Sequence, residues 1–215
     1  MINWQGAVEV ICGPMFSGKT EELIRRVRRA QIARLRVQIF KPSIDNRYAE
    51  EEVVSHSSLS IKAEAVDSSA DVLTKIKDNT RVVAIDEVQF FDEGILQVIT
   101  KLADQGRRVI CAGLDLDYKA KPFGHIPELL AIADDVYKIK AICTVCGQPA
   151  TRSQRLSLDN TDVVLVGEKD YYEARCRAHY DYEEKEAKIE EAEEIEAQKE
   201  ESTFLSSMPD SHFAN

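Results

Sequence analysis

The chain has 215 residues, of which 44% are apolar and 31% are charged, and its formal net charge is −10. This is ordinary globular composition, sufficient for one sizeable core and a small appendage. No apolar run approaches the roughly 20 residues that a membrane-spanning helix requires, and the first residues lack the pattern of a signal peptide. We therefore expect a cytoplasmic protein that makes no membrane contact.

The negative charge is concentrated in the last segment. Residues 181–215 contain twelve acidic residues and three lysines, so they carry −9, whereas residues 1–180 carry −1. A near-neutral body offers no electrostatic footprint for a polyanion, and we expect no nucleic-acid partner. Residues 181–215 are rich in helix formers but have almost no apolar stripe, which predicts an acidic tail that is helical or disordered.

Short apolar runs alternate with longer amphipathic ones along the body, which predicts strands alternating with helices. In chain order we expect a strand at 7–12, a helix at 19–34, a strand at 37–40, a polar segment at 43–60 with at most a short strand near Val53, a helix at 68–77, a strand at 81–85, a helix at 92–104, a strand at 108–112, a helix near 126–133 and a strand near 136–142. Strands this apolar are buried on both faces, so the fold class is α/β with a parallel sheet flanked by helices.

A phosphate-binding loop follows the first strand. The segment GPMFSGKT matches the pattern G-x4-G-K-T, and its residues are Gly13, Pro14, Met15, Phe16, Ser17, Gly18, Lys19 and Thr20. The glycines let successive backbone N–H groups face a triphosphate at the positive end of the next helix. Lys19 can reach the outer phosphates, and Thr20 can offer its hydroxyl to Mg²⁺. The expected ligand is a nucleoside triphosphate, bound in a P-loop NTPase-type domain.

An acidic pair ends the strand expected at 81–85. Asp86 stands where a carboxylate can hold Mg²⁺ beside the phosphates, and Glu87 is close enough to act as a general base. The pair does not decide between a kinase and an ATPase, because Glu87 could polarise water as readily as a substrate hydroxyl. Arg47, in the polar segment, could place a guanidinium near the phosphates or could lie in a solvent-exposed loop.

Two chelating pairs lie near the end of the body. Cys143 and Cys146 form one pair and Cys176 and His179 the other, each separated by two residues. Together they can close a tetrahedral Zn²⁺ site, and since all four positions come from the protein the metal is expected to be structural. Cys12 and Cys111 lie in apolar runs and are expected to be buried small hydrophobic residues.

With these residues in hand, the chain resembles the cytosolic-type, zinc-containing thymidine kinases. The resemblance covers residues 7–180 and rests on GPMFSGKT, AIDEVQFF at 84–91, GLDLDYKAKPFG at 113–124 and the two chelating pairs. It implies transfer of the γ-phosphate of ATP to the 5′-hydroxyl of thymidine or deoxyuridine, a homotetramer, and feedback inhibition by dTTP. His179 stands where many relatives have cysteine, and Tyr118 where some have phenylalanine.

The resemblance also assigns roles to individual residues. Glu87 is similar to the proton acceptor, Thr20 and Asp86 to the Mg²⁺ partners, and the segment Asp86, Glu87, Val88 and Gln89 to the lining of the nucleotide site. The nucleoside site would be lined by Met15, Leu114, Tyr118, Phe123, Ser153, Val163, Val164, Leu165, Val166, Gly167 and Tyr172. The implied organisation is an ATP-binding α/β domain at 1–140, a small zinc-ribbon-like domain that encloses the nucleoside at 141–180, and the acidic tail at 181–215.

Two other functions remain open on the residues alone. A P-loop ATPase would need the same phosphate loop and acidic pair, and a zinc-ribbon nucleic-acid-binding protein would need the same cysteine pairs. The kinase is favoured because Tyr118 and Phe123, together with the metal-held segment, suit the enclosure of a small flat base.

Overall fold

The computed structural model describes residues 6–44, 52–54, 60–156 and 171–181. The chain divides into two compact units, Met1–Tyr180 and Asp181–Asn215, and the second falls almost entirely outside these ranges. The finer division expected within the first unit stays a prediction. None of the described helices is both long and apolar enough to cross a bilayer.

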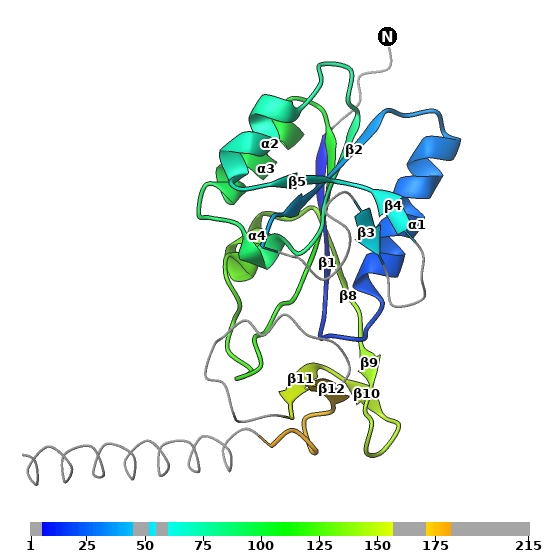
Figure 1. Cartoon of the computed structure of the whole chain (residues 1–215), viewed down its shortest axis with the longest axis vertical. Coiled ribbons are helices and arrows are strands. Elements are labelled where there is room, and N and C mark those ends of the chain that lie inside the picture. Colours follow the sequence, from blue (N-terminus) through cyan, green and yellow to red (C-terminus); the bar gives the residue numbers. More distant parts are fainter. Residues whose placement is uncertain (1–5, 45–51, 55–59, 157–170, 182–215) are drawn as a thin grey trace, which may run out of the picture. The chain divides into compact units, whose positions relative to one another are not determined.

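A six-stranded sheet forms the centre of the first unit (Figure 1). Its order is β5-β2-β6-β7-β1-β8, and every neighbouring pair is parallel. The strands are β1 (Ala7–Cys12), β2 (Val37–Pro42), β5 (Glu64–Val66), β6 (Val82–Ile85), β7 (Arg108–Gly113) and β8 (Asp135–Lys138). This confirms the predicted parallel α/β fold.

Helices cover both faces of the sheet (Figure 1). Helix α1 (Lys19–Ile32) packs on one face, and α2 (Ser69–Lys75), α3 (Ile95–Asp104) and α4 (Ile126–Ile132) pack on the other. Because successive strand residues point to opposite faces, Val83 and Ile85 join the core under α2–α4 while Val82 and Ala84 join the core under α1. The central strands β1, β6 and β7 are therefore apolar at most positions.

Short antiparallel pairs extend beyond the main sheet. Strands β9 (Ala141–Ile142) and β10 (Pro149–Ala150) form one pair, and β11 (Arg152–Arg155) and β12 (Tyr172–Arg175) form another. We call residues 141–156 and 171–180 the Cys-His lobe. A third pair joins β3 (Glu52–Val54) and β4 (Ser60–Lys62), in the region where a short strand was expected near Val53.

One predicted element needs correction, and one strand of the main sheet was not predicted. The single strand expected near 136–142 is two strands, because the chain leaves the main sheet after Lys138 and enters the Cys-His lobe at Ala141. Strand β8 also differs from the other strands, since all four of its residues are exposed at the sheet edge. Strand β5 was not expected, because three residues are too few to show the alternation of apolar and polar side chains by which a strand is recognised in a sequence.

Candidate active site and metal centre

The phosphate loop turns sharply between β1 and α1. Gly13 and Gly18 have φ values of 147° and 88°, and Phe16 also lies in the left-handed region at 62°. A Cβ on Gly13 would lie 2.2 Å from the Ile139 carbonyl oxygen, so only glycine fits there. Lys19, the first residue of α1, is buried, and its Nζ donates to the Pro14 carbonyl oxygen at 2.8 Å.

The acidic pair follows β6 at the same edge of the sheet as the phosphate loop, since β1, β7 and β6 are adjacent parallel strands. Asp86 and Glu87 are 6% and 8% exposed, so they are not surface carboxylates. Glu87 takes a left-handed conformation (φ 48°, ψ 43°), and its N–H donates to Asp86 Oδ1 at 3.1 Å. Such a conformation is uncommon for a residue with a side chain and often marks a functional position.

Gln89 connects the acidic pair to a second motif. Its Nε2 donates to Glu87 Oε2 at 2.6 Å, and its Oε1 accepts from the Leu114 N–H at 3.0 Å. Gln89 is buried in the short 3-10 helix η1 (Val88–Phe90). It therefore holds the Glu87 carboxylate with one end of its amide and the start of the GLDLDYKAKPFG segment with the other.

That segment, residues 113–124, folds into a compact turn that we call the 113–124 loop. Leu116 and Pro122 form a β-bridge, and Asp117 Oδ1 accepts from the N–H groups of Lys119 and Lys121, both at 2.8 Å. The Phe123 ring packs edge-on against Phe90, with centroids 5.6 Å apart. Leu114, Tyr118 and Phe123 are all partly buried in this loop.

The Cys-His lobe contacts the phosphate loop directly. Ser153 Oγ accepts from the Met15 N–H at 3.0 Å, across 138 residues of sequence. Phe16 packs on the small apolar cluster of the lobe, which contains Ala141, Cys143, Ala150 and Ala174. The structure thus brings the expected site residues Met15 and Ser153 together, although they belong to different motifs.

One arginine, Arg155, contacts the expected site residue Tyr118 and pairs in the β11–β12 register with another, Tyr172. The Arg155 guanidinium carbon is 4.9 Å from the centroid of the Tyr118 ring, and Arg155 is the register partner of Tyr172 in β11–β12. Tyr172 is buried. Arg47, Val163, Val164, Leu165, Val166 and Gly167 lie outside the described residues.

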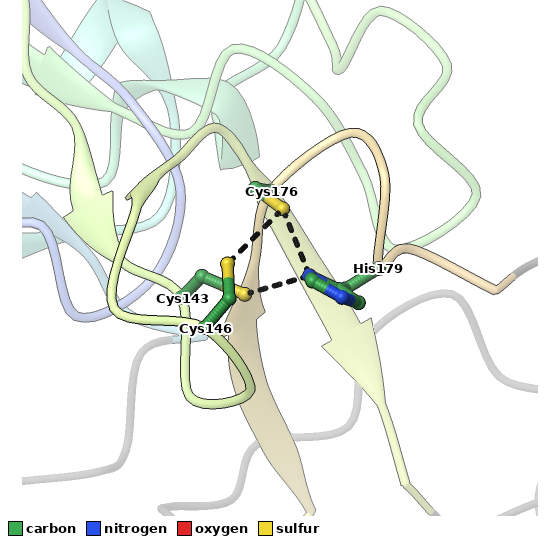
Figure 2. A group of neighbouring side chains, drawn as sticks. All are labelled: Cys143, Cys146, Cys176 and His179. Atoms are coloured by element: carbon green, nitrogen blue, oxygen red, sulfur yellow. Dashed lines mark hydrogen bonds between the residues drawn. The ribbon is translucent and has the colours of Figure 1, made fainter.

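The two chelating pairs converge in the Cys-His lobe (Figure 2). One donor atom from each of Cys143, Cys146, Cys176 and His179 lies within 4.8 Å of the other three. The sulfurs of Cys146 and Cys176 are 3.8 Å apart, and His179 Nδ1 is 3.2 Å from Cys176 Sγ and 3.8 Å from Cys143 Sγ. A tetrahedral site with Zn–S bonds of ~2.3 Å would separate its donors by about 3.5–3.8 Å, so this donor set fits Zn²⁺.

Backbone N–H groups lower the pKa of the Cys143 thiol and so favour the thiolate form, which is the form that binds a metal. Burial raises the pKa of Cys143, but the N–H groups of Cys176, Cys146 and Val145 outweigh it and lower that pKa to about 6. The two cysteines outside the cluster are different: burial raises the pKa of Cys12 to about 11 and that of Cys111 further. Cys12 and Cys111 are therefore inert buried residues, as expected.

Three contacts of the site were not predicted. Gln89 bridges Glu87 and Leu114, Lys138 Nζ forms an ion pair with the buried Asp115 at 2.6 Å, and Tyr180 Oη donates to the Tyr118 carbonyl oxygen at 2.6 Å. Each joins residues of different motifs or segments. A sequence pattern contains no signal for such pairs, although the Gln89 and Asp115 positions lie inside recognised motifs.

The family model described as "Thymidine kinase" matches residues 6–180, which include all the motifs above. The chain belongs to the thymidine kinase family. This confirms the resemblance, and with it the class of an ATP-dependent phosphotransferase whose family reaction is the phosphorylation of thymidine. Among solved structures, the ATPase DotB of Legionella pneumophila is similar over 60% of this chain, with 16% identity and a TM-score of 0.36. The match spans 34% of that ATPase, and at this level the likeness says nothing about function.

Proposed function

We propose that this thymidine kinase family member transfers the γ-phosphate of ATP to the 5′-hydroxyl of thymidine or deoxyuridine, giving dTMP or dUMP and ADP. The reaction would serve pyrimidine deoxynucleoside salvage for DNA synthesis in the cytoplasm. The observation that supports it most directly is the family match over residues 6–180. Within that range three neighbouring strands of one sheet lead into the proposed site: β1 is followed by the phosphate loop, β6 by the acidic pair and β7 by the aromatic 113–124 loop.

The proposed catalytic groups divide the work by their chemistry. Lys19 neutralises the outer phosphates, and Glu87 takes the proton of the 5′-hydroxyl as the phosphoryl group arrives. Thr20 and Asp86 would hold Mg²⁺, which supplies charge neutralisation on the phosphates when it is bound. The hydrogen bond from Gln89 to Glu87 Oε2 supports this assignment, because it fixes the carboxylate in one orientation.

The proposed nucleoside site uses the Cys-His lobe as its second wall. Leu114, Tyr118, Phe123 and Met15 would pack around the base, with Ser153 and Tyr172 on the side of the lobe. Two contacts between these groups support the proposed site. The Met15 N–H donates to Ser153 Oγ, and Arg155, the register partner of Tyr172, packs on the Tyr118 ring. Zn²⁺ at Cys143, Cys146, Cys176 and His179 would be structural, because four protein donors leave no position for water or substrate.

The deciding experiment is ATP turnover with and without nucleosides. A kinase should be nearly idle with ATP alone and should release ADP in step with phosphorylated thymidine when thymidine is added. A panel of nucleosides then ranks thymidine against deoxyuridine. ATP hydrolysis that ignores every nucleoside, or that responds only to nucleic acid, would contradict the proposal.

Assembly and regulation complete the proposal. Family resemblance supports a homotetramer and inhibition by dTTP, the end product of the salvage route. Sedimentation at micromolar concentration measures the first, and thymidine phosphorylation at increasing dTTP measures the second. A monomeric protein, or one whose activity dTTP leaves unchanged, would contradict these two points without affecting the assignment of the reaction.

A further inference from the structure

Tyr180 connects the metal-ligand cluster to the 113–124 loop. It directly follows His179, and its hydroxyl donates to the Tyr118 carbonyl oxygen at 2.6 Å. The two residues are 62 positions apart in sequence. Because the acceptor is a backbone carbonyl near the tip of the loop, the bond holds the course of the chain there and does not depend on which side chain Tyr118 carries.

The cluster fixes the position of Tyr180. The His179 ring nitrogen faces the cysteine sulfurs (Figure 2), and the His179 N–H donates to the Cys176 carbonyl oxygen at 3.1 Å. Arg175 Nη1 donates to the His179 carbonyl oxygen at 3.3 Å. With its neighbour held through the ring, the N–H and the carbonyl group, the backbone that carries Tyr180 has little freedom.

The same tip of the loop has a second contact with the lobe. The Arg155 guanidinium lies over the Tyr118 ring, with 4.9 Å from its carbon to the ring centroid. Arg155 belongs to β11, whose partner β12 ends one residue before Cys176. Arginine over an aromatic face attracts the ring but tolerates sliding. The directional bond from Tyr180 therefore restricts the position of the tip more strictly than the contact with Arg155 does.

We propose that Tyr180 is a positioning residue through which the metal-ligand cluster holds the 113–124 loop in place for the nucleoside. Its effect on thymidine rests on the proposed function, whereas its effect on the loop does not. A metal ion bound at the cluster would then influence the loop without contacting it. It would order the turn Cys176–His179 and thereby fix the position of Tyr180, whose hydrogen bond holds the part of the loop that carries Tyr118.

Tyr180→Phe tests this with the loss of a single hydroxyl. Since one hydrogen bond is removed and the ring is kept, KM for thymidine should rise about 3- to 10-fold, while kcat and KM for ATP stay within about twofold. The zinc content should remain that of the unaltered protein. Tyr137→Phe is the matched control, because Tyr137 is a half-exposed tyrosine on β8, outside the proposed site. It should leave KM for thymidine unchanged.

Trypsin provides a readout that needs no activity. Cleavage after Lys119 reports the freedom of the tip, whereas the Lys121–Pro122 bond resists trypsin and should stay intact. Cleavage after Lys119, followed by mass spectrometry, should be several-fold faster in Tyr180→Phe than in the unaltered protein or in Tyr137→Phe. Chelation of the metal should speed this cleavage in the unaltered protein and add little in Tyr180→Phe.

The outcomes separate this inference from the proposed function. Unchanged cleavage after Lys119 in Tyr180→Phe would overturn the positioning role, and so would a chelator effect of equal size in both proteins. If no nucleoside is phosphorylated, the proposed function fails while the cleavage rates still decide the role of Tyr180. If the kinase is active and the loop is loosened but KM for thymidine does not move, Tyr180 holds the loop without serving the nucleoside, and the proposal is overturned in that part.

Discussion

Buried branched side chains line both faces of the six-stranded sheet, and phenylalanines join them on the α2–α4 face, whereas the buried cluster of the Cys-His lobe consists of three alanines and one cysteine. Burying a Val, Leu or Ile side chain contributes about 1.5–3 kcal/mol each, and alanine far less. The sheet can therefore hold its loops by packing alone. The described residues of the lobe bury too little apolar volume for that, and we expect the lobe to depend on its proposed metal ligands and on its contacts with the phosphate loop.

This difference separates two kinds of proposed functional residue. Those at the sheet edge, such as Lys19 and Glu87, are buried and held by a rigid core, which suits groups that must meet the phosphates without rearrangement. Those on the lobe are positioned through long-range hydrogen bonds such as Met15–Ser153. Changes at the edge should therefore affect chemistry, and changes in the lobe should affect the binding of the nucleoside.

The largest expected effect is that of Glu87→Gln. The change keeps size and hydrogen bonding but removes the proton acceptor, so kcat should fall about 10²- to 10⁴-fold while both substrates still bind with near-normal affinity. Rapid-quench measurement of the chemical step checks this. Glu93→Gln is the control, because Glu93 is an exposed carboxylate a few residues away. Near-normal kcat in Glu87→Gln, where chemistry limits the rate, would show that another group is the base.

Lys19→Ala should come next. Loss of a charged donor to the triphosphate should raise KM for ATP about 10- to 100-fold and should also lower kcat, because the charge acts before and during transfer. Lys101→Ala, an exposed lysine at the end of α3, should change neither value. Titration of ATP against each variant provides the measurement. Unaltered ATP affinity in Lys19→Ala would exclude Lys19 from the phosphate site.

Cys176→Ser should affect the metal content and the position of the Cys-His lobe more than it affects the binding of ATP. We expect the protein to lose its zinc, measured by elemental analysis, and kcat/KM for thymidine to fall about tenfold as the nucleoside wall loses its position. KM for ATP should change less. Ala178→Ser introduces a hydroxyl into the same turn without removing a donor, and it should retain the metal. If the unaltered protein contains no zinc after purification without chelators, the metal assignment itself is wrong.

The sequence predicted best what is contiguous or strictly spaced. The phosphate loop, the pair Asp86–Glu87 and the chelating pairs were recognisable because each consists of neighbouring residues whose chemistry requires that spacing. The break between β8 and β9 was not recognisable in the sequence, because hydropathy does not indicate which strand a segment pairs with. The contacts of Gln89 with Leu114 and of Tyr180 with Tyr118 were not predicted for a related reason: the partners are distant in sequence, and only the fold brings them together.

The smallest effect is expected from removing residues 185–215. The sequence of that segment has almost no apolar stripe, and it lies beyond the last motif. The truncated protein should keep kcat and both KM values within about twofold and should unfold at nearly the same temperature. A truncated chain that precipitates, or that loses most of its activity, would show that the tail supports the body.

Gln89 also limits how the site can vary. A Cβ on Gly113 would lie 2.5 Å from Gln89 Oε1, and one on Gly124 would lie 2.4 Å from the Gln89 carbonyl oxygen. Gly113 thus lies against the side-chain amide of Gln89, and Gly124, at the other end of the 113–124 loop, lies against its backbone carbonyl group. Glutamate in its place would put an oxygen where Nε2 now donates to Glu87, so two carboxylates would face each other. The glutamine, the glycines and the acid consequently form one unit, and a substitution at any of these positions requires compensation at another.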